Sequence, residues 1–475
     1  MLFCSQQFLL FFAAVFALYW AIPWPRFRIY LLLVASFAFY ASWNRWLAGI
    51  ICISTFTDYV VGRLLERPAA PLRRKLLLGA SLGVNLGLLG YFKYADFFLR
   101  SLEDVLRAAG AVASLPVLKV LLPIGISFYT FEAISYTVDV YRRRIPAERN
   151  LAHFMLFILF FPHLIAGPIV RARDFLPQLR RRKYWDWARL NLGFQFFLMG
   201  LFKKIVIADR MAIYYVDPVF SRPPAFSSSS IWLAALAWAL QVYCDFSGYS
   251  DMAIGCAHML GYKLGKNFDM PYLATNMSEL WRRWHISLTS WIRDYLFIPF
   301  GGSRGSAWQT ARNVAITMAL CGLWHGARWT YVVFGFLQAG ILLGHRAFRS
   351  YCGQRPNLRT VLESGPGTAF RVSLTFLAFC CTLVVFRADT VSSGFSMLRS
   401  MAFPHGGLPM PLPLGSLWCA ALIVAVSHLI GCSGRWKRLA LRLPAPVIGA
   451  AQAATLTLAL MFAMGSGNTF IYFQF

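Results

Sequence analysis

Long apolar runs separated by short basic segments dominate the chain. Most of these runs have 16 to 25 residues, which is close to the length that a helix needs to cross a bilayer. The runs lie at 7–22, 27–43, 46–62, 76–99, 118–141, 189–213, 231–260, 328–346, 368–386, 414–431 and 446–465. The pattern therefore predicts an all-α polytopic membrane protein with roughly 10–12 transmembrane helices. We expect loops at 350–367 and 387–413, and we expect the aromatic C-terminus, 470–475, to anchor at the membrane interface.

The basic segments follow a consistent topology. If alternate segments face the same side and the N-terminus lies outside, the basic loops at 26–28, 63–75 and 142–149 all face one side. Cytoplasmic loops of membrane proteins are enriched in Lys and Arg, so that side is predicted to be cytoplasmic. Arg26 is the first basic residue, so the first run lacks the charged start of a cleaved signal peptide.

One apolar segment conflicts with simple alternation. A complete crossing by 151–169 would place the very basic segment that follows it on the outer side. A re-entrant segment, broken at its prolines and at Gly167, would keep that basic segment inside. Irregular backbone at membrane depth is tolerated only where it lines a cavity or is buried in protein. We therefore predict a re-entrant hairpin here.

Composition supports these predictions. The 475 residues are 58% hydrophobic and 14% charged, whereas soluble domains have about 25% charged residues. The net charge of +27 is attributed to topology rather than to nucleic-acid binding. The 10 cysteines show no paired metal or redox spacing, so we expect no metal site and no disulfide framework. We expect one polytopic domain, 1–475, with N-terminal spans in 1–115, a catalytic core in 116–349 and C-terminal spans in 350–475.

The stretch from 279 to 326 is the most distinctive part of the chain. If 281–295 forms one helix, aromatic and apolar residues make a single stripe on it and the arginines lie mostly off that stripe. Such a helix is expected to lie in the membrane interface. His285 falls on the apolar side, where an imidazole needs a hydrogen-bonding partner. The stripe consists of Trp281, Trp284, Leu288, Trp291, Ile292 and Tyr295.

A second histidine ends the same stretch. The run 310–326 is apolar enough to enter a bilayer, and Cys321 and Gly322 precede His325 by four and three positions. These small residues share a helical face with His325, so we expect a close contact with another helix there. An ionisable residue in such a place is a functional candidate.

A buried histidine suits one reaction in particular. A neutral imidazole can accept the proton of a hydroxyl that attacks an acyl group. The thiolate of a thioester, whose parent thiol has a pKa of about 8.5, departs without much help from an acid. The alternative is that His285 and His325 are hydrogen-bonded core residues. Cys321 could pair with His325 as a nucleophile, although a packing role explains it as well.

Other charged residues allow a functional and a structural interpretation. Asp245 and Asp251, in an otherwise apolar run, could orient an imidazole, line a tunnel or form a structural polar network. The run 189–213 contains Lys203, Lys204, Asp209 and Arg210, so part of it is expected to leave the lipid. Arg171 and Arg173 open a basic cluster that could bind the phosphates of a donor such as coenzyme A. Topology alone would also explain that cluster. The remaining histidines show no ligand spacing.

Several motifs are similar to those of the membrane-bound O-acyltransferases, in particular the branch containing the membrane subunit of bacterial alginate O-acetyltransferase. They occur in order along nearly the whole chain. They are LPIGISFYTF at 122–131, FPHLIAGPI at 161–169, DFSGYSDMAIG at 245–255, ELWRRWH at 279–285, LWHGA at 323–327, VFRA at 385–388 and FIYF at 470–473.

The resemblance implies a helical core around a funnel or tunnel that leads to a buried histidine, in the bacterial inner membrane. It implies that His325 matches the catalytic histidine and His285 the second active-site histidine. Trp324 next to His325 would line the substrate tunnel. The implied donor is acetyl-CoA or another cytoplasmic acyl thioester, with no bound cofactor. The implied acceptor is an exported, alginate-like polysaccharide, reached with an extracytoplasmic acetyltransferase partner. D-alanyl transfer to teichoic acid and a non-catalytic transporter or export scaffold are the alternatives.

Overall fold

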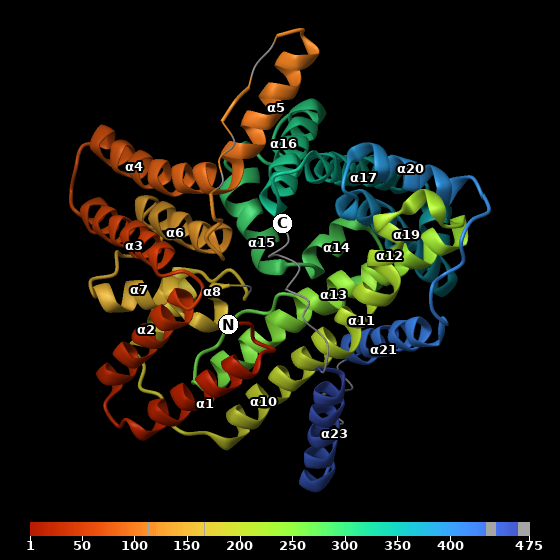
Figure 1. The fold of residues 1–475 in the computed structure, drawn as a ribbon. Helices are drawn as coiled ribbons and strands as arrows, with labels where there is room; N and C mark the ends of the chain where they lie inside the picture. Colours follow the sequence, from red (N-terminus) through yellow and green to blue (C-terminus); the bar gives the residue numbers. More distant parts are fainter. Residues whose placement is uncertain (112–113, 117, 119, 166, 434–442, 464–475) are drawn as a thin grey trace. The chain divides into compact units, whose positions relative to one another are not determined.

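The computed structural model describes residues 1–475 except 112–113, 117, 119, 166, 434–442 and 464–475 (Figure 1). The described residues are helical apart from turns, loops and one isolated bridge between Phe226 and Leu408. The all-α prediction is therefore confirmed. The chain forms two compact units, Met1–Phe197 with Ser250–Gly265, and Leu198–Tyr249 with Lys266–Phe475.

The first unit contains the helices up to α10. They are α1 (Gln6–Ala21), α2 (Pro25–Ala41), α3 (Arg45–Glu66), α4 (Pro71–Leu89), the π-helix η1 (Gly90–Tyr94), α5 (Ala95–Ala108), α6 (Ile126–Tyr141), α7 (Leu151–Leu159), α8 (Phe161–Leu164), α9 (Ala172–Leu179) and α10 (Trp187–Phe202), which continues into the second unit. Local sequence sets several starts: Pro25 and Pro71 lie in first turns, and the Asn44 side chain accepts hydrogen bonds from the first backbone amides of α3.

A buried polar cluster joins three helices of this unit. Asp58 on α3 accepts hydrogen bonds from Ser81 and Asn85 on α4, at 2.5 and 2.8 Å, and from Thr137 on α6, at 3.4 Å. All four residues are buried. The neutral donors compensate for removing this carboxyl group from water.

The segment predicted to be re-entrant is broken, as expected. The nine-residue α7 and the four-residue α8 meet at Phe160. At about 1.5 Å per residue, neither can span a hydrocarbon layer of about 30 Å. His163 on α8 is buried with its Nδ1 3.2 Å from Oε1 of Glu132 on α6, a pairing that the sequence did not indicate.

The second unit contains the remaining elements. They are the π-helices η2 (Lys203–Ala208), η3 (Ala212–Val216) and η6 (Arg293–Phe297), the 3₁₀ helices η4 (Pro223–Ala225) and η5 (Pro271–Leu273), α11 (Asp209–Met211), α12 (Asp217–Ser221), α13 (Ser228–Met259), α14 (Met277–Arg283), α15 (Ile286–Ile292), α16 (Ala307–His325), α17 (Trp329–Gly353), α18 (Pro356–Glu363), α19 (Gly365–Arg387), α20 (Val391–Ala402), α21 (Gly415–Cys432) and α23 (Ala445–Ala463). The last ten residues of α13 belong to the first unit.

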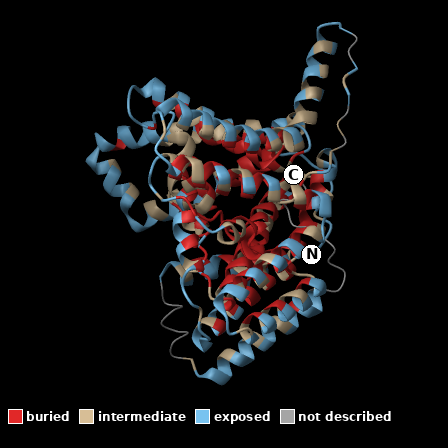
Figure 2. Cartoon of the chain, turned by 90° about the vertical axis from the view of Figure 1, so that its left-hand side faces the viewer, coloured by how far each residue is buried: buried red, intermediate tan, exposed pale blue. Residues whose placement is uncertain are grey.

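Seven helices among the described residues are long and apolar enough to cross a membrane, which confirms a multi-pass membrane protein. Figure 2 shows that the outer faces of many helices are exposed, as expected for surfaces that face lipid. The predicted count of 10–12 also includes shorter helices such as α1. The seven are Arg45–Glu66, Pro71–Ala108, Trp187–Ser221, Trp329–Gly353, Gly365–Arg387, Gly415–Cys432 and Ala445–Phe462.

Three boundaries differ from the predictions. The predicted loops 350–367 and 387–413 are wrong in part, because α18 and α20 lie within them. The run at 118–141 is helical only from Ile126, after Gly125, which has a positive φ of 75°. Such a conformation favours glycine and ends helical continuity. The aromatic C-terminal anchor lies outside the described residues.

Helices α16 and α17 pack backbone to backbone. A Cβ atom added at Gly335 on α17 would lie 2.3 Å from the Met318 carbonyl oxygen on α16. We therefore expect Gly335→Ala to separate the two helices and to lower the thermal unfolding temperature of the purified protein by several degrees. Gly340→Ala on the same helix is the control, because no atom lies within 4 Å of its added Cβ. Equal unfolding temperatures for the two variants would contradict this packing.

Candidate active site

His285 lies at a break between two short helices. The predicted single helix over 281–295 is wrong: α14 ends at Arg283, and His285 has the left-handed φ and ψ of 45° and 53°. At this break, backbone groups form hydrogen bonds with a distant loop instead of within a helix. The Ile286 amide donates to the Asn267 carbonyl at 2.9 Å, and the Asp269 amide donates to the Arg283 carbonyl at 2.8 Å. A left-handed non-glycine residue costs about 1–3 kcal/mol, and such strain clusters at functional sites.

The polar and apolar sides of this stretch are sorted as predicted. Arg282 and Arg293 are exposed, whereas the stripe is buried in protein except for half-buried Tyr295. Trp281 donates to the Gln338 side-chain oxygen on α17 at 3.2 Å. The apolar side therefore packs against neighbouring helices inside the protein.

The imidazole of His285 is enclosed by neutral groups. It is 0% exposed, and its Nδ1 lies 3.2 Å from Oδ1 of Asn267. The Phe246 ring on α13 meets it edge-on at 4.5 Å between centroids, and the Trp324 ring lies at 5.8 Å. His285 is outside the candidate spans, and burial, with a smaller contribution from His325, lowers its pKa. His285 is therefore neutral near pH 7.

His325 is the last residue of α16 and is 6% exposed. Its ring lies 5.0 Å from Trp324 and 5.3 Å from Phe386 on α19. The expected close helix contact is confirmed, because added Cβ atoms at Gly322 and Gly326 would collide with Tyr331 on α17. The Trp324 ring contacts the rings of both histidines, so residues 40 positions apart in sequence belong to one buried cluster.

Comparison with known proteins identifies the family. The family model described as MBOAT, membrane-bound O-acyltransferase family, matches residues 142–386, just over half of the chain. The chain belongs to this family. It is therefore an acyltransferase, and both histidines lie within the matched region.

Three relatives of this chain are named for three different acceptor polymers. The chain is 42% identical to the probable alginate O-acetylase AlgI of Azotobacter vinelandii, over 90% of this chain and 83% of the relative. It is 34% identical to the peptidoglycan O-acetyltransferase of Helicobacter pylori, over 80% and 75%. The teichoic acid D-alanyltransferase of Bacillus subtilis is 27% identical over 48% of this chain and 60% of the relative.

Asp245 belongs to a buried charge triad of this acyltransferase. Its Oδ1 lies 2.7 Å from Nζ of Lys204, and the same Nζ lies 2.7 Å from Oδ1 of Asp209. All three side chains are 4% exposed or less. Lys204 and Asp209, which belong to the run 189–213, thus pair inside the protein, where they are shielded from lipid. The geometry therefore supports the structural alternative for Asp245, a buried polar network that here consists of the triad.

The other candidate residues lie in different environments. Asp251 follows Asp245 by six positions on α13, which turns it about 120° around the helix axis. Cys321 is buried one turn before His325. Arg171 is buried, whereas Arg173 is exposed with its Nε 3.7 Å from Oδ2 of Asp174. Of the two arginines, Arg173 is the one that presents its guanidinium to solvent.

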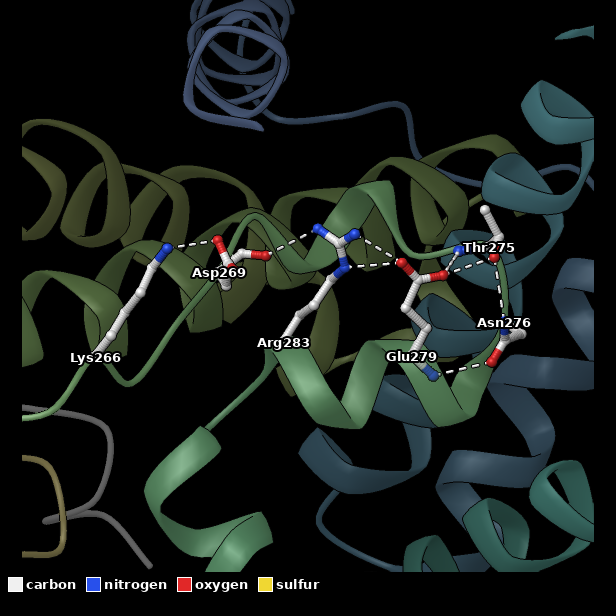
Figure 3. A network of polar contacts seen from close by, with 6 residues as sticks. All are labelled: Lys266, Asp269, Thr275, Asn276, Glu279 and Arg283. Carbon is white, nitrogen blue, oxygen red and sulfur yellow. Dashed lines mark hydrogen bonds and ion pairs between the residues drawn. The ribbon is translucent and has the colours of Figure 1, made fainter. Parts of the chain in front are cut away.

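A polar network, here called the clasp, fixes the loop before α14; it consists of Arg283, Glu279, Thr275 and Asp269. The Arg283 guanidinium donates to Oε1 of Glu279 through both Nη2, at 2.7 Å, and Nε, at 3.0 Å, and to the Asp269 carbonyl at 3.3 Å (Figure 3). Glu279 Oε2 accepts from the amide and hydroxyl of Thr275. Partial burial raises the pKa of Glu279, but these hydrogen bonds outweigh that effect and lower it. Glu279 is therefore ionised at neutral pH, and the clasp is intact.

Asn267 is the contact residue that the sequence analysis missed. It lies 18 positions before His285 in a segment without regular structure, so no helical spacing relates the two. No signal in a single sequence could have paired them.

Proposed function

We propose that this acyltransferase resides in the bacterial inner membrane and O-acetylates an exported, alginate-like polysaccharide. Acetyl would come from a cytoplasmic thioester, acetyl-CoA, and would reach the polymer through an extracytoplasmic partner protein. The proposal is supported by two relatives whose matches cover 80% or more of this chain, a probable alginate O-acetylase and a peptidoglycan O-acetyltransferase. We propose that the exposed guanidinium of Arg173 binds the donor's phosphates and that the buried Arg171 adds its positive charge to the same phosphate site.

The proposed chemistry uses the two buried histidines. An acceptor hydroxyl oxygen bonds to the acyl carbon while His325 takes its proton, and the carbon–sulfur bond then breaks. The proton on the imidazole returns to the leaving thiolate, which balances the reaction. His285 positions or polarises the acyl group, and Trp324, which contacts both imidazole rings, forms a wall of the substrate tunnel.

The observation that carries this proposal is the cluster of His285, Trp324 and His325 in a member of an acyltransferase family. Family membership disfavours the non-catalytic transporter. D-alanyl transfer remains a second candidate because the D-alanyltransferase shares 27% identity, although over less than half of this chain.

Inverted membrane vesicles with a co-expressed partner test the proposal. Labelled acetyl-CoA is added to the outside of the vesicles, which is the cytoplasmic side. The acceptor inside the vesicles is then isolated, its esters are hydrolysed, and the released acids are identified. We expect labelled acetate esters inside sealed vesicles and none in vesicles without this protein. Alanine esters, formed when an activated alanine thioester is supplied instead, would favour the second candidate. If neither acetate nor alanine esters form, both candidate functions are contradicted.

A further inference from the structure

The side-chain oxygen of Asn267 is a hydrogen-bonding hub beneath His285. It lies 3.2 Å from the His285 Nδ1, 3.2 Å from the Ser287 backbone nitrogen and 2.9 Å from the Ser287 hydroxyl. Asn267 and His285 are both buried. One amide oxygen thus faces three possible donors.

The backbone of Ser287 decides which way the Asn267 amide points. A backbone N–H can only donate, so the atom facing it must be the amide oxygen and not the NH₂ group. Turning the amide over would place two donors against each other in a buried site, which costs about 1–3 kcal/mol. The orientation of Asn267 therefore follows from the fold and not from the histidine.

This orientation determines where His285 carries its proton. An atom that faces an oxygen acceptor must donate, so Nδ1 bears the hydrogen. In a neutral imidazole the other nitrogen then holds a lone pair, so Nε2 is an acceptor. The titratable group acting on His285 is His325 on α16, while Asn267, Phe246 and Trp324 around it carry no charge.

The clasp explains how Asn267 is held in place. Two backbone hydrogen bonds align 267–269 with 283–286, and the Arg283 guanidinium ties the Asp269 carbonyl to Glu279 (Figure 3). Lys266 pairs with the Asp269 carboxylate at 2.5 Å on the exposed side. The loop that carries Asn267 is thereby fixed to the helix that precedes His285.

We propose that Asn267 is a positioning residue that keeps the proton of His285 on Nδ1 and presents Nε2 as a hydrogen-bond acceptor. With Nε2 as an acceptor, His285 cannot donate a hydrogen bond to the acyl carbonyl, so of its two proposed roles it positions the substrate and does not polarise the acyl group. The attacking hydroxyl has one proton, which goes to His325, so the hydrogen bond that Nε2 accepts comes from a different donor of the bound substrate. This inference rests on the proposed function for its catalytic meaning, but the tautomer itself does not.

The tautomer is tested without any reaction. The purified full chain, labelled with ¹⁵N in histidine, is examined by NMR, and the His285 signals are assigned by their loss in His285→Gln. We expect a protonated Nδ1 and an unprotonated Nε2 in the wild type, and a mixture or the opposite tautomer in Asn267→Ala. An Nε2–H tautomer in the wild type, or an unchanged spectrum in Asn267→Ala, would overturn the proposal.

Acetyl transfer by the same variants tests the consequence. We expect Asn267→Ala to lower kcat about 10- to 100-fold, as removal of groups that orient an imidazole does elsewhere. Asn267→Asp retains the acceptor, so most activity should return at alkaline pH. Its added charge raises the pKa of His285, so the acid limb of the rate profile should move to higher pH.

Asn357→Ala, on the exposed face of α18, is the matched control and should leave rate and profile unchanged. A merely structural Asn267 would give equal losses in the Ala and Asp variants with an unshifted profile, and that result would overturn the proposal. A wild type with the expected tautomer but no acetyl transfer would instead refute the proposed function.

Discussion

Replacing His325 with alanine is expected to lower acetyl transfer by about 10²- to 10⁴-fold, the usual effect of removing a general base. The imidazole contacts the rings of Trp324 and Phe386 at the end of α16. Its loss removes the proposed proton acceptor. The measurement is the initial rate of labelled acetyl transfer in vesicles, at matched amounts of folded protein.

Cys321→Ala is the control for this prediction, because Cys321 lies one turn earlier on the same helix and is also buried. We expect it to retain most activity, which would exclude a thiol nucleophile. Thermal unfolding of both variants separates chemistry from folding. If His325→Ala transfers acetyl at the wild-type rate, His325 is not the base.

Replacing Lys204 with methionine is expected to destabilise the protein by about 3–5 kcal/mol, as breaking a buried ion pair does. The ammonium group lies 2.7 Å from both Asp209 and Asp245, so its loss leaves two carboxylates buried near each other. We expect little folded protein in membranes and a strongly lowered unfolding temperature in detergent. Both are measured on matched preparations.

A triple variant tests the cause of that loss. Lys204→Met with Asp209→Asn and Asp245→Asn removes every charge of the triad and should recover much of the stability. Lys263→Met, an exposed lysine, should have no measurable effect. Failure of the triple variant to recover stability would mean that lost packing, rather than unpaired charge, causes the effect.

Local patterns predicted the helical elements well because they depend on neighbouring residues. Runs such as 46–62 and 368–386 became α3 and α19 within a few residues, since apolar length decides which segments can be membrane helices. The small residues Cys321 and Gly322 before His325 likewise indicated the close contact with α17. The prediction that 281–295 is continuous was wrong, because distant residues supply partners that local patterns do not show.

Apolar periodicity and contiguous motifs are enough to identify a multi-pass helical membrane protein, its family and the two candidate histidines, His285 and His325. How these two histidines are held depends on contacts that form only in the folded chain. The break at His285 exists because loop atoms of residues 267 and 269 take over hydrogen bonds there. The partners of Asp245 and His285 lie 41 and 18 positions away, on segments with no periodic relation to them. Burial of polar groups requires such partners, and folding alone brings them together.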